Sequence, residues 1–203
     1  AENAVPALKP LLVQSVEVLD KLVKRLMAST SAYEPVALDT ETTDLNPFRA
    51  ELVGIGVCWG EELDALAYIP LGHKSSEDSA PPQLQLPLET VLGALAPWLA
   101  SAEHPKTLQN AKYDRLILLR HGLALNGVVI DTLLADYLRD AAAKHGLELM
   151  AEREFGFQPT AFSDLVGKKQ TFADVPLEAA SLYCGMDVHV TRRLALLLRR
   201  RLE

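Results

Sequence analysis

The sequence predicts an α/β fold in which a central sheet is flanked by helices. In the second half of the chain, short apolar runs alternate with segments of helical pattern, which is typical of a sheet with helices packed against it. A chain of 203 residues, 49% of them hydrophobic, is long and apolar enough to bury a core of its own. These observations indicate one globular domain, and the sequence contains no internal repeats.

The N-terminal half begins with a helix and continues with strands. Residues 1–14, which contain proline and alanine, are expected to form a loose N-terminal extension of a domain covering residues 15–203. Ser15 to Ala28 has the spacing of an amphipathic helix. The Ser- and Pro-rich segment from His73 to Pro87 predicts a loop. Apolar runs predict strands near residues 35–39, 50–59 and 64–70.

The C-terminal half alternates between the two kinds of element. Asn110 is the predicted N-cap of a helix that begins near residue 112. Pro176-Leu177-Glu178 predicts the start of the last helix, because proline is accepted in the first turn and the helix dipole favours an acid there. The apolar pattern of that helix continues to Leu198. The remaining predictions are helices near 88–100, 112–121 and 131–139, and strands near 106–109 and 127–130.

Asp39 and Glu41 directly follow the predicted strand Pro35-Val36-Ala37-Leu38. On a strand, residues i and i+2 point to the same face, so both carboxylates project together from the strand end. Two anions so close repel each other, which favours a proton or a cation between them. Taken alone, such a pair is more often a solvated strand end before a turn, because the pattern is common.

Two further segments carry candidate site residues. Asp114 lies in the first turn of a predicted helix, where the dipole stabilises an acid even without a function. Tyr183 and Asp187 are four residues apart on the last predicted helix, so the phenol and the carboxylate share a face. Each feature in isolation also fits a structural role.

Together, the three segments resemble the 3′–5′ proofreading exonuclease domain of bacterial DNA polymerase I. That domain belongs to the DEDD exonuclease superfamily, in the branch whose third motif is Tyr-x-x-x-Asp. The likeness spans residues 33–198 and includes other segments: Leu52-Val53-Gly54-Ile55, Ala67-Tyr68-Ile69-Pro70, Asp131-Thr132-Leu133-Leu134, Ala151-Glu152-Arg153 and Thr171-Phe172. The resemblance implies a ribonuclease-H-like fold with a mixed central sheet.

The resemblance also implies a chemistry: 3′→5′ removal of deoxynucleoside monophosphates from single-stranded or frayed DNA. Two divalent ions, Mg²⁺ or in its place Mn²⁺, are expected to be held by Asp39, Glu41, Asp114 and Asp187. Magnesium prefers hard oxygen ligands, and two such ions, roughly 4 Å apart, clamp the attacking and leaving oxygens of an in-line displacement. Tyr183 is expected to orient the attacking water, because a phenol with a pKa near 10 is a poor base at neutral pH.

Other residues are expected, from the resemblance, to meet the DNA strand. Leu45 matches a position that wedges against the terminal base, and Thr42 is expected to line the same pocket. Phe162 either stacks on a base, as aromatic residues do in single-strand channels, or belongs to the core. Three residues next to the middle acid are expected to contact the strand: Gln109, Asn110 and Tyr113.

The net charge of −7 is unusual for a protein that binds a polyanion. Bound metal ions would offset part of the acid excess at the site. Residues 192–193 and 199–201, all arginines, are interpreted as a solvated helix end, where cations oppose the dipole, rather than as phosphate contacts. Local positive charge near the strand is expected from Lys112, Arg115, Lys168 and Lys169.

Two other functions stay open from the sequence. A stand-alone nuclease of the ribonuclease D type, which trims RNA or DNA 3′ ends, shares the three motifs. The Val-Gly-Ile and Tyr-Ile-Pro segments argue against it. An inactive nucleic-acid-binding domain is the second alternative, and the presence of all four acids argues against that one.

The cellular setting is inferred from simple features of the chain. Cys58 and Cys184 are too few for a disulfide framework and lie in predicted core elements, which fits a reducing cytosol. The chain lacks a signal-peptide pattern at its start and any run of ~20 apolar residues. We therefore expect a cytoplasmic monomer with no membrane contact and, in the full-length protein, a covalently attached polymerase domain. The sequence does not distinguish an excised domain from a stand-alone nuclease.

Overall fold

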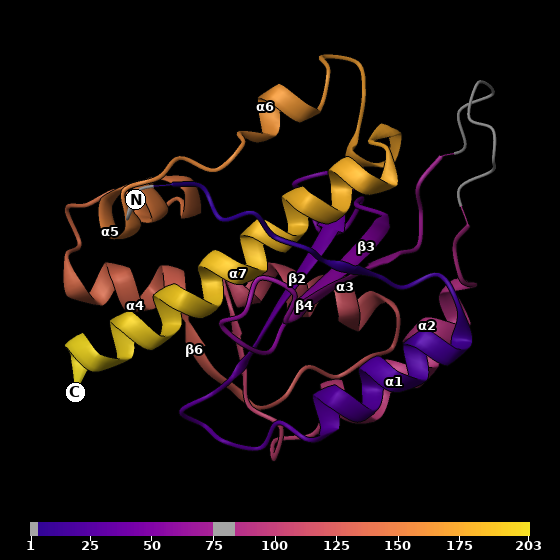
Figure 1. The fold of residues 1–203 in the computed structure, drawn as a ribbon, viewed down its shortest axis with the longest axis horizontal. Helices are drawn as coiled ribbons and strands as arrows, with labels where there is room; N and C mark the ends of the chain where they lie inside the picture. The colour runs from indigo at the N-terminus through magenta and orange to yellow at the C-terminus, as the bar shows by residue number, and fades with distance from the viewer. Residues whose placement is uncertain (1–3, 75–83) are drawn as a thin grey trace.

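A computed structural model describes residues 4–74 and 84–203 and contains a six-stranded sheet flanked by helices, as predicted (Figure 1). The strands are β1 (Leu11–Leu12), β2 (Val36–Thr42), β3 (Leu52–Cys58), β4 (Leu66–Pro70), β5 (Lys106–Leu108) and β6 (Val128–Asp131). The helices are α1 (Val16–Met27), α2 (Leu88–Ala100), α3 (Ala111–Arg120), α4 (Thr132–Arg139), α5 (Leu147–Phe155), α6 (Phe162–Leu165) and α7 (Leu177–Leu202), with a 3-10 helix at Phe172–Asp174.

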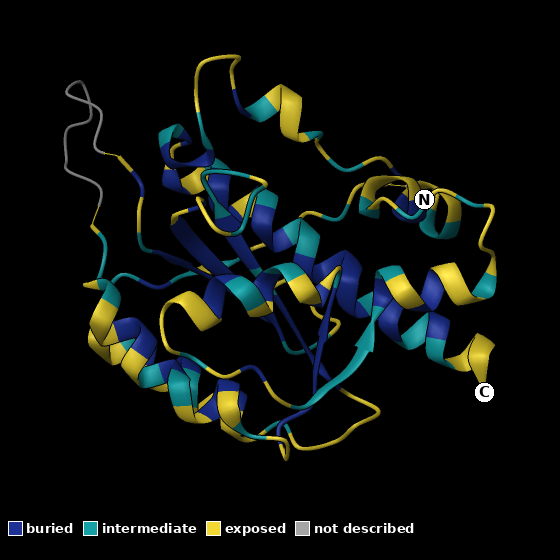
Figure 2. Ribbon diagram, turned by 180° about the vertical axis from the view of Figure 1, so that it is seen from behind, coloured by how far each residue is buried: buried dark blue, intermediate teal, exposed yellow. Residues whose placement is uncertain are grey.

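The sheet is mixed, in the order β1-β4-β3-β2-β5-β6. Strands β2, β3 and β4 form an antiparallel meander, and β1 pairs parallel to β4 at one edge. On the other side, β5 runs parallel to β2 and β6 runs parallel to β5. Figure 2 shows the central strands in dark blue, whereas β6 at the edge is teal, because its residues are only half-buried.

The alternation of β2 side chains determines which helix layer the acids face. Leu38 belongs to the core that α1 and α2 cover, whereas Ala37 packs against Val188 of α7. Since side chains alternate along a strand, Asp39 and Glu41 follow Ala37 and face α7. The 26 residues of α7 cross this face of the sheet from one end to the other (Figure 1).

The first helix confirms the predicted amphipathic segment. Ser15 caps α1 by accepting a hydrogen bond from the backbone N–H of Val18, and Leu19, Leu22 and Leu26 are buried on its inner face. These leucines pack with α2 in the larger of the core clusters. Their spacing is the helical period that the sequence displays.

The expectation that residues 1–14 are loose is wrong for the last part of that segment. Leu11 and Leu12 pair with β4, and the backbone N–H of Val13 donates to Tyr68 O at 2.9 Å. Leu8 and Val13 are buried. A strand of two residues is too short to show a period in the sequence, and the free edge of β4 supplies the partners that order it.

The structure confirms Asn110 as the N-cap residue of α3, but the hydrogen bonds at this helix start come from another side chain. Asn110 occupies the cap position with a φ of 62°, but its side chain makes no capping bond. The carboxylate of Asp131 accepts from the N–H groups of Asn110 and Ala111 at 3.0 and 2.8 Å, and also caps α4 through Leu133 at 3.0 Å. One acid at the end of β6 therefore joins the start of two helices.

The C-terminal arginines are not simply a solvated helix end. Arg192 is buried and forms an ion pair with Glu34, and Arg199 donates to the backbone of Ala32. Arg201 pairs with Glu154 of α5 at 2.8 Å. Only residues 199–201 lie in the last turn of α7, whereas Arg192 lies well inside the helix. Packing of the chain before β2 and of α5 against α7 gives these cations their partners.

Within the described ranges 4–74 and 84–203, no helix combines the length and the apolar character needed to cross a membrane. The predicted loop at 73–87 contains no helix or strand in its described residues, and residues 75–83 lie outside them.

We predict that Asp131→Ala lowers the free energy of unfolding by about 2 to 4 kcal/mol, since two helix caps are lost together. Urea denaturation followed by circular dichroism measures this. Asp131→Asn is the matched control, because asparagine also caps helices and should lose less than half as much. Equal stability of the alanine variant and the wild type would contradict this role.

Candidate active site

Three elements bring their acids to one cleft of about 600 Å³. Asp39 and Glu41 lie at the end of β2, and Asp114 lies in the first turn of α3. Asp187 lies on α7, about one helical turn after Tyr183. Glu41 and Asp114 are buried, with 8% and 2% of their surface exposed. The predicted acids, far apart in the sequence, therefore share one site.

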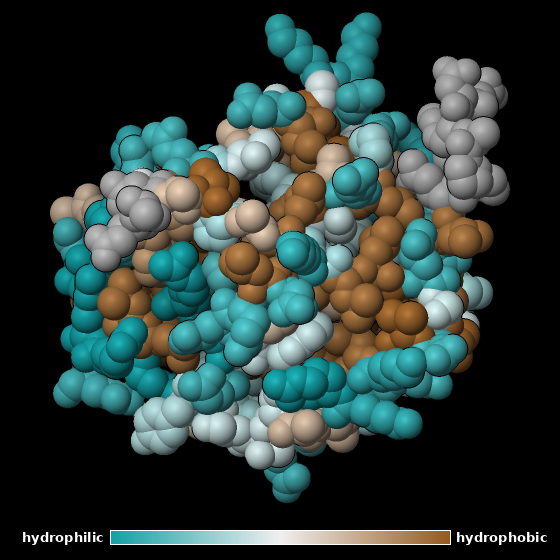
Figure 3. Space-filling view, viewed as in Figure 1, coloured by the Kyte–Doolittle hydropathy of each residue, from teal (hydrophilic) through white to brown (hydrophobic). Residues whose placement is uncertain are grey.

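Most of the predicted DNA contacts line the same cleft. Thr42, Leu45, Gln109, Asn110, Tyr113 and Phe162 all border it with the four acids. Tyr183 borders an adjoining apolar hollow of about 540 Å³ that it shares with Asp187. Its ring centroid lies 5.8 Å from that of Phe172 and 6.3 Å from that of Phe162. Figure 3, which views the face crossed by α7, shows apolar side chains in brown between hydrophilic ones.

Burial and mutual repulsion shift the pKa of every acid upward. Burial, followed by the charge of Asp187, raises the pKa of Asp39 well above its usual range. Burial and then Asp39 and Asp187 do the same for Glu41. Burial, followed by the charge of Glu148, raises the pKa of Asp187 to about 7. Without a cation, this cluster therefore favours bound protons near neutral pH.

Asp114 is held by the backbone of the strand that carries the first two acids. Its Oδ1 accepts from the N–H of Thr40 at 3.0 Å and from the Thr40 hydroxyl at 2.7 Å. The pairing of β2 with β5 ends at Ala37, so the later N–H of Thr40 is free for this contact. The bonds fix the distance between α3 and β2, although burial and Asp39 still raise the pKa of Asp114.

The Tyr183 phenol is shielded from ionisation. Burial, followed by the charges of Asp187 and Glu41, raises its pKa far above the ordinary value of a tyrosine. A phenol in this setting stays protonated at neutral pH, so it can donate or accept a hydrogen bond but cannot serve as a base. This is compatible with the expectation that Tyr183 orients the attacking water.

A braced turn after β2 presents Leu45 to the cleft. Leu45 is 94% exposed, although it is a large apolar residue. The Tyr113 hydroxyl lies within hydrogen-bonding distance of Thr42 Oγ1 and of Asp44 O, and Asp44 Oδ1 accepts from Asn46 N at 2.8 Å. The hydroxyls of Thr42 and Tyr113 therefore support the turn. Their contact with DNA stays a prediction.

Gln109 is also engaged inside the protein. Its Nε2 donates to His145 O at 2.8 Å, and its Oε1 accepts from Thr132 Oγ1 at 2.5 Å. His145 is in turn bound through Nδ1 to the buried Asp136 at 2.6 Å. These bonds tie the end of β5 to the chain before α5, and they leave Gln109 little freedom to reorient.

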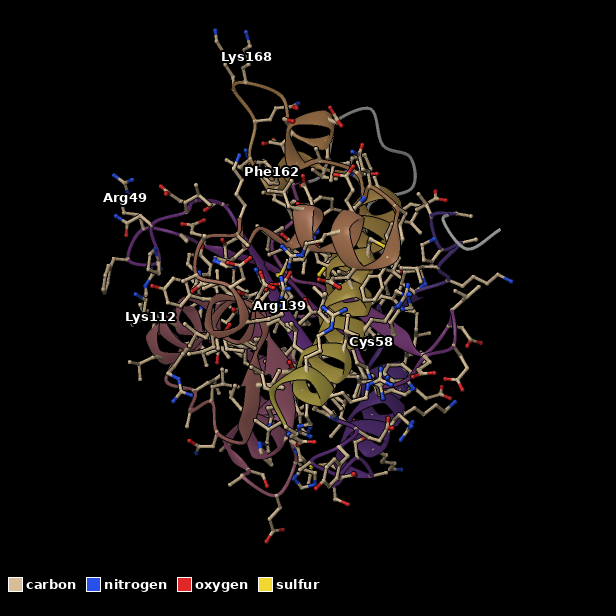
Figure 4. The ribbon with its side chains drawn as sticks, turned by 90° about the vertical axis from the view of Figure 1, so that its left-hand side faces the viewer. Arg49, Cys58, Lys112, Arg139, Phe162 and Lys168 are labelled. Carbon is tan, nitrogen blue, oxygen red and sulfur yellow. The ribbon has the colours of Figure 1, made fainter. Side chains whose placement is uncertain are left out.

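Phe162 is not a core residue, because 47% of its surface is exposed on α6. Lys112, Arg115, Lys168 and Lys169 are all exposed, as a strand-binding role requires. In Figure 4, Lys168 extends away from the body of the protein, while Arg49 and Lys112 lie at another edge. The positive charge is thus dispersed around the site.

Three residues near the acids were not found from the sequence. Thr40 holds Asp114, Glu148 on α5 acts on Asp187 and Tyr183 through its charge, and Cys184 lies beside Asp39 and Glu41. Their positions inside the motifs could have indicated two of them, since Thr40 lies between Asp39 and Glu41 and Cys184 directly follows Tyr183. No sequence signal indicates Glu148, because only the packing of α5 against α7 brings it close to Asp187 and Tyr183.

The cleft fits a metal ion on its own chemistry. Glu41 Oε1 is buried and has no hydrogen-bond partner. A carboxylate oxygen in that position is costly without a donor or a cation. The neighbouring carboxylates of Asp39, Asp114 and Asp187 add the hard oxygen ligands that divalent ions prefer.

Residues 13–203 match the family described as 3'-5' exonuclease. The chain belongs to this 3'-5' exonuclease family. It is 42% identical to DNA polymerase I of Synechocystis sp. over 198 residues, which are 97% of this chain and 19% of that protein. It is 35% identical to DNA polymerase I of Chloroflexus aurantiacus over 211 residues, or 100% of this chain and 21% of that protein.

This exonuclease-family chain therefore spans about a fifth of the length of these curated relatives. Escherichia coli RNase D, an exoribonuclease involved in structured RNA processing, has a similar structure, with a TM-score of 0.66 and 19% identity. The match covers 95% of this chain and 45% of that one. It shows the ribonuclease-H-like fold alone, as expected. Membership of the exonuclease family implies dependence on divalent metal ions, and the acidic cluster provides a place for them.

We predict that, in chelator, the free energy of unfolding falls as pH rises from about 4 through 7. The folded pKa of Asp187, about 7, exceeds its ordinary value of 3.8. Its contribution is therefore fully present below the unfolded pKa and is lost as pH rises through the folded one. Urea denaturation at several pH values measures the slope.

Asp187→Asn is the control for this prediction, because the amide has nearly the same shape and does not ionise. The variant should show a shallower fall, and Mg²⁺ should flatten the wild-type curve by stabilising the ionised acids. An identical slope in the variant and the wild type would show that Asp187 is not the titrating group.

Proposed function

We propose that this exonuclease-family chain removes deoxynucleoside monophosphates from the 3′ end of single-stranded or frayed DNA, with two Mg²⁺ ions as cofactors. One observation carries the proposal: four carboxylates from β2, α3 and α7 converge at one cleft in a chain of this family, and the Tyr183 phenol borders the hollow beside it. Mn²⁺ is expected to replace Mg²⁺, because both accept oxygen ligands.

The family resemblance implies a role for each acid. Asp39, Glu41 and Asp187 would hold one ion, and Asp39 with Asp114 the other. When bound, the two ions would acidify the attacking water and neutralise the charge that develops at the scissile phosphate. Thr40 keeps Asp114 at a set distance from Asp39, since it donates twice to Oδ1. Asp114 would act on its ion mainly through bound waters.

Tyr183 would position the attacking water by hydrogen bonding. Its raised pKa keeps the proton on the phenol, so the tyrosine acts through orientation. The rings of Phe162 and Phe172 lie next to the Tyr183 ring and restrict its movement. A group that is held in place loses less entropy when the water must be aligned.

The rim of the cleft supports specificity for a strand end. Leu45 projects from a braced turn and would wedge against the terminal base. Glu41 would also contact the terminal 3′-hydroxyl, and Phe162, exposed on α6, would stack on a base. An internal nucleotide has no free 3′-hydroxyl, which would explain the preference for ends.

The relatives named above are DNA polymerases, which favours proofreading as the setting. In that setting a polymerase domain in the same polypeptide would hold the duplex and release a frayed primer end to this cleft. DNA is the preferred substrate in this proposal. A direct comparison of DNA and RNA strands of one sequence distinguishes it from an RNA-trimming enzyme of the ribonuclease D type.

We predict that the chain converts 5′-labelled single-stranded DNA into a ladder that shortens from the 3′ end in Mg²⁺ and stops in chelator. Denaturing gel electrophoresis resolves the products. The double variant Asp39→Ala with Glu41→Ala is the control and should give no ladder. Cleavage that persists in chelator, or that starts at internal positions, would refute the proposed function.

We predict that Tyr183→Phe lowers the single-turnover rate by roughly 10- to 1000-fold, the range for one positioned polar group. Ring packing survives, and only the hydroxyl is lost. The rate is measured at saturating DNA and Mn²⁺. Tyr33→Phe is the matched control, because Tyr33 is 69% exposed outside the cleft. A wild-type rate in the Tyr183 variant would remove this residue from the mechanism.

A further inference from the structure

A cysteine lies directly beside the first two acids. One ligand atom each from Asp39, Glu41 and Cys184 lie within 4.8 Å of one another. Among the residues that the structure describes, this is the one group of three or more such side chains that could hold a metal ion. Cys184 is fully buried on α7, between this helix and the sheet.

The sheet is shaped to accept the sulfur at this place. A Cβ atom on Gly56 would lie 2.4 Å from Cys184 Sγ, which is far inside van der Waals contact. Gly56 of β3 is the register partner of Asp39 of β2. The absence of a side chain on Gly56 therefore leaves the space in which the thiol reaches the strand that carries Asp39 and Glu41.

Glu41 provides a second, independent observation. Its Oε1 is buried and has no hydrogen-bond partner, and only 8% of the residue is exposed. Such an oxygen is costly in a buried place unless a donor, a proton or a cation meets it. The sulfur and this oxygen belong to the same three-residue group, so one ion can satisfy both.

We propose that Asp39, Glu41 and Cys184 form a binding site for a thiophilic divalent ion such as zinc, cadmium or cobalt. The proposal rests on the metal-binding roles given above to Asp39 and Glu41, and it adds a sulfur ligand to them. Zinc accepts sulfur and carboxylate ligands in tetrahedral sites, whereas magnesium requires oxygen. Softer ions therefore gain a ligand here that magnesium cannot use.

Binding is a ligand exchange without oxidation or reduction. The Cys184 thiol releases its proton to solvent, and the sulfur donates an electron pair to the ion in place of a water molecule. Because Asp39 and Glu41 serve both arrangements, a thiophilic ion and the magnesium ions compete for them. Zinc is thus expected to inhibit at concentrations well below those at which magnesium supports cleavage.

Cobalt titration of the metal-free chain tests the site directly. A cobalt–thiolate bond produces a charge-transfer band in the near ultraviolet, which carboxylate ligands alone do not produce. We expect the band in the wild type and its loss in Cys184→Ala and Cys184→Ser. Zinc should abolish the band at stoichiometric amounts, and a similar amount of magnesium should not.

Cys58→Ala is the matched control, because Cys58 is the other cysteine of the chain. Its thiol is also buried, but it donates to Gly60 O at 3.3 Å and packs among apolar residues. This variant should keep the band. Far-ultraviolet circular dichroism confirms that each variant is folded, and the serine variant preserves the size of the side chain if alanine disturbs the packing.

A second measurement gives the affinity without relying on cleavage. Competition with a chromophoric chelator should show that Cys184→Ala weakens zinc binding at least about tenfold, as expected when a ligand or its support is lost. Absence of the band in the wild type, its persistence in both Cys184 variants, or unchanged zinc affinity would overturn the proposal. A band in a protein that cuts no DNA would refute the proposed function alone, and cleavage without a band would refute this site alone.

Discussion

The mutual repulsion of four carboxyl groups in one buried corner is the constraint on which the rest of the structure depends. Asp39, Glu41, Asp114 and Asp187 are drawn from three elements, and each has a pKa above its ordinary range. Such a cluster opposes folding whenever the acids are ionised and no cation is present. The surrounding fold must therefore be stable enough to hold the acids together.

The stability comes from apolar layers on both faces of the sheet. One face is covered by α1 and α2 through a large cluster of buried residues, and the other is covered by α7. Hydrogen bonds fix the helix starts next to the strand ends. Thr40 holds Asp114, and Asp131 holds the start of α3 and α4. The chemistry-bearing side chains are thus attached to elements that pack on the core and are held by hydrogen bonds, which favours a preorganised site.

The same corner connects the two proposals. Oxygen ligands from β2, α3 and α7 suit magnesium, and the sulfur of Cys184 extends this set toward softer ions. Glu41 belongs to both arrangements and carries an oxygen with no internal partner. Ion choice at this site would then depend on one buried side chain that lies within the third motif, next to Tyr183.

Local rules predicted much of the fold and most of the site. The positions of the main helices and strands followed from apolar spacing, and the pairing of Asp39 with Glu41 and of Tyr183 with Asp187 followed from strand and helix periods. Family resemblance joined these pairs to Asp114. The resemblance could do this because the three motifs follow one another along the chain in the order typical of the exonuclease family, to which the chain belongs.

The sequence by itself determined the direction in which each side chain leaves its own element, and hence the candidate acids. Only the tertiary structure decided which side chains meet across elements. It ordered Leu11–Leu12 on the edge of β4 and paired Arg192 with Glu34. It also supplied the carboxylate of Asp131 to the N–H groups at the start of α3, and placed Cys184 over Gly56. The physical reason is that periodicity acts within one segment, whereas partners, caps and buried charges depend on contacts between segments distant in the chain.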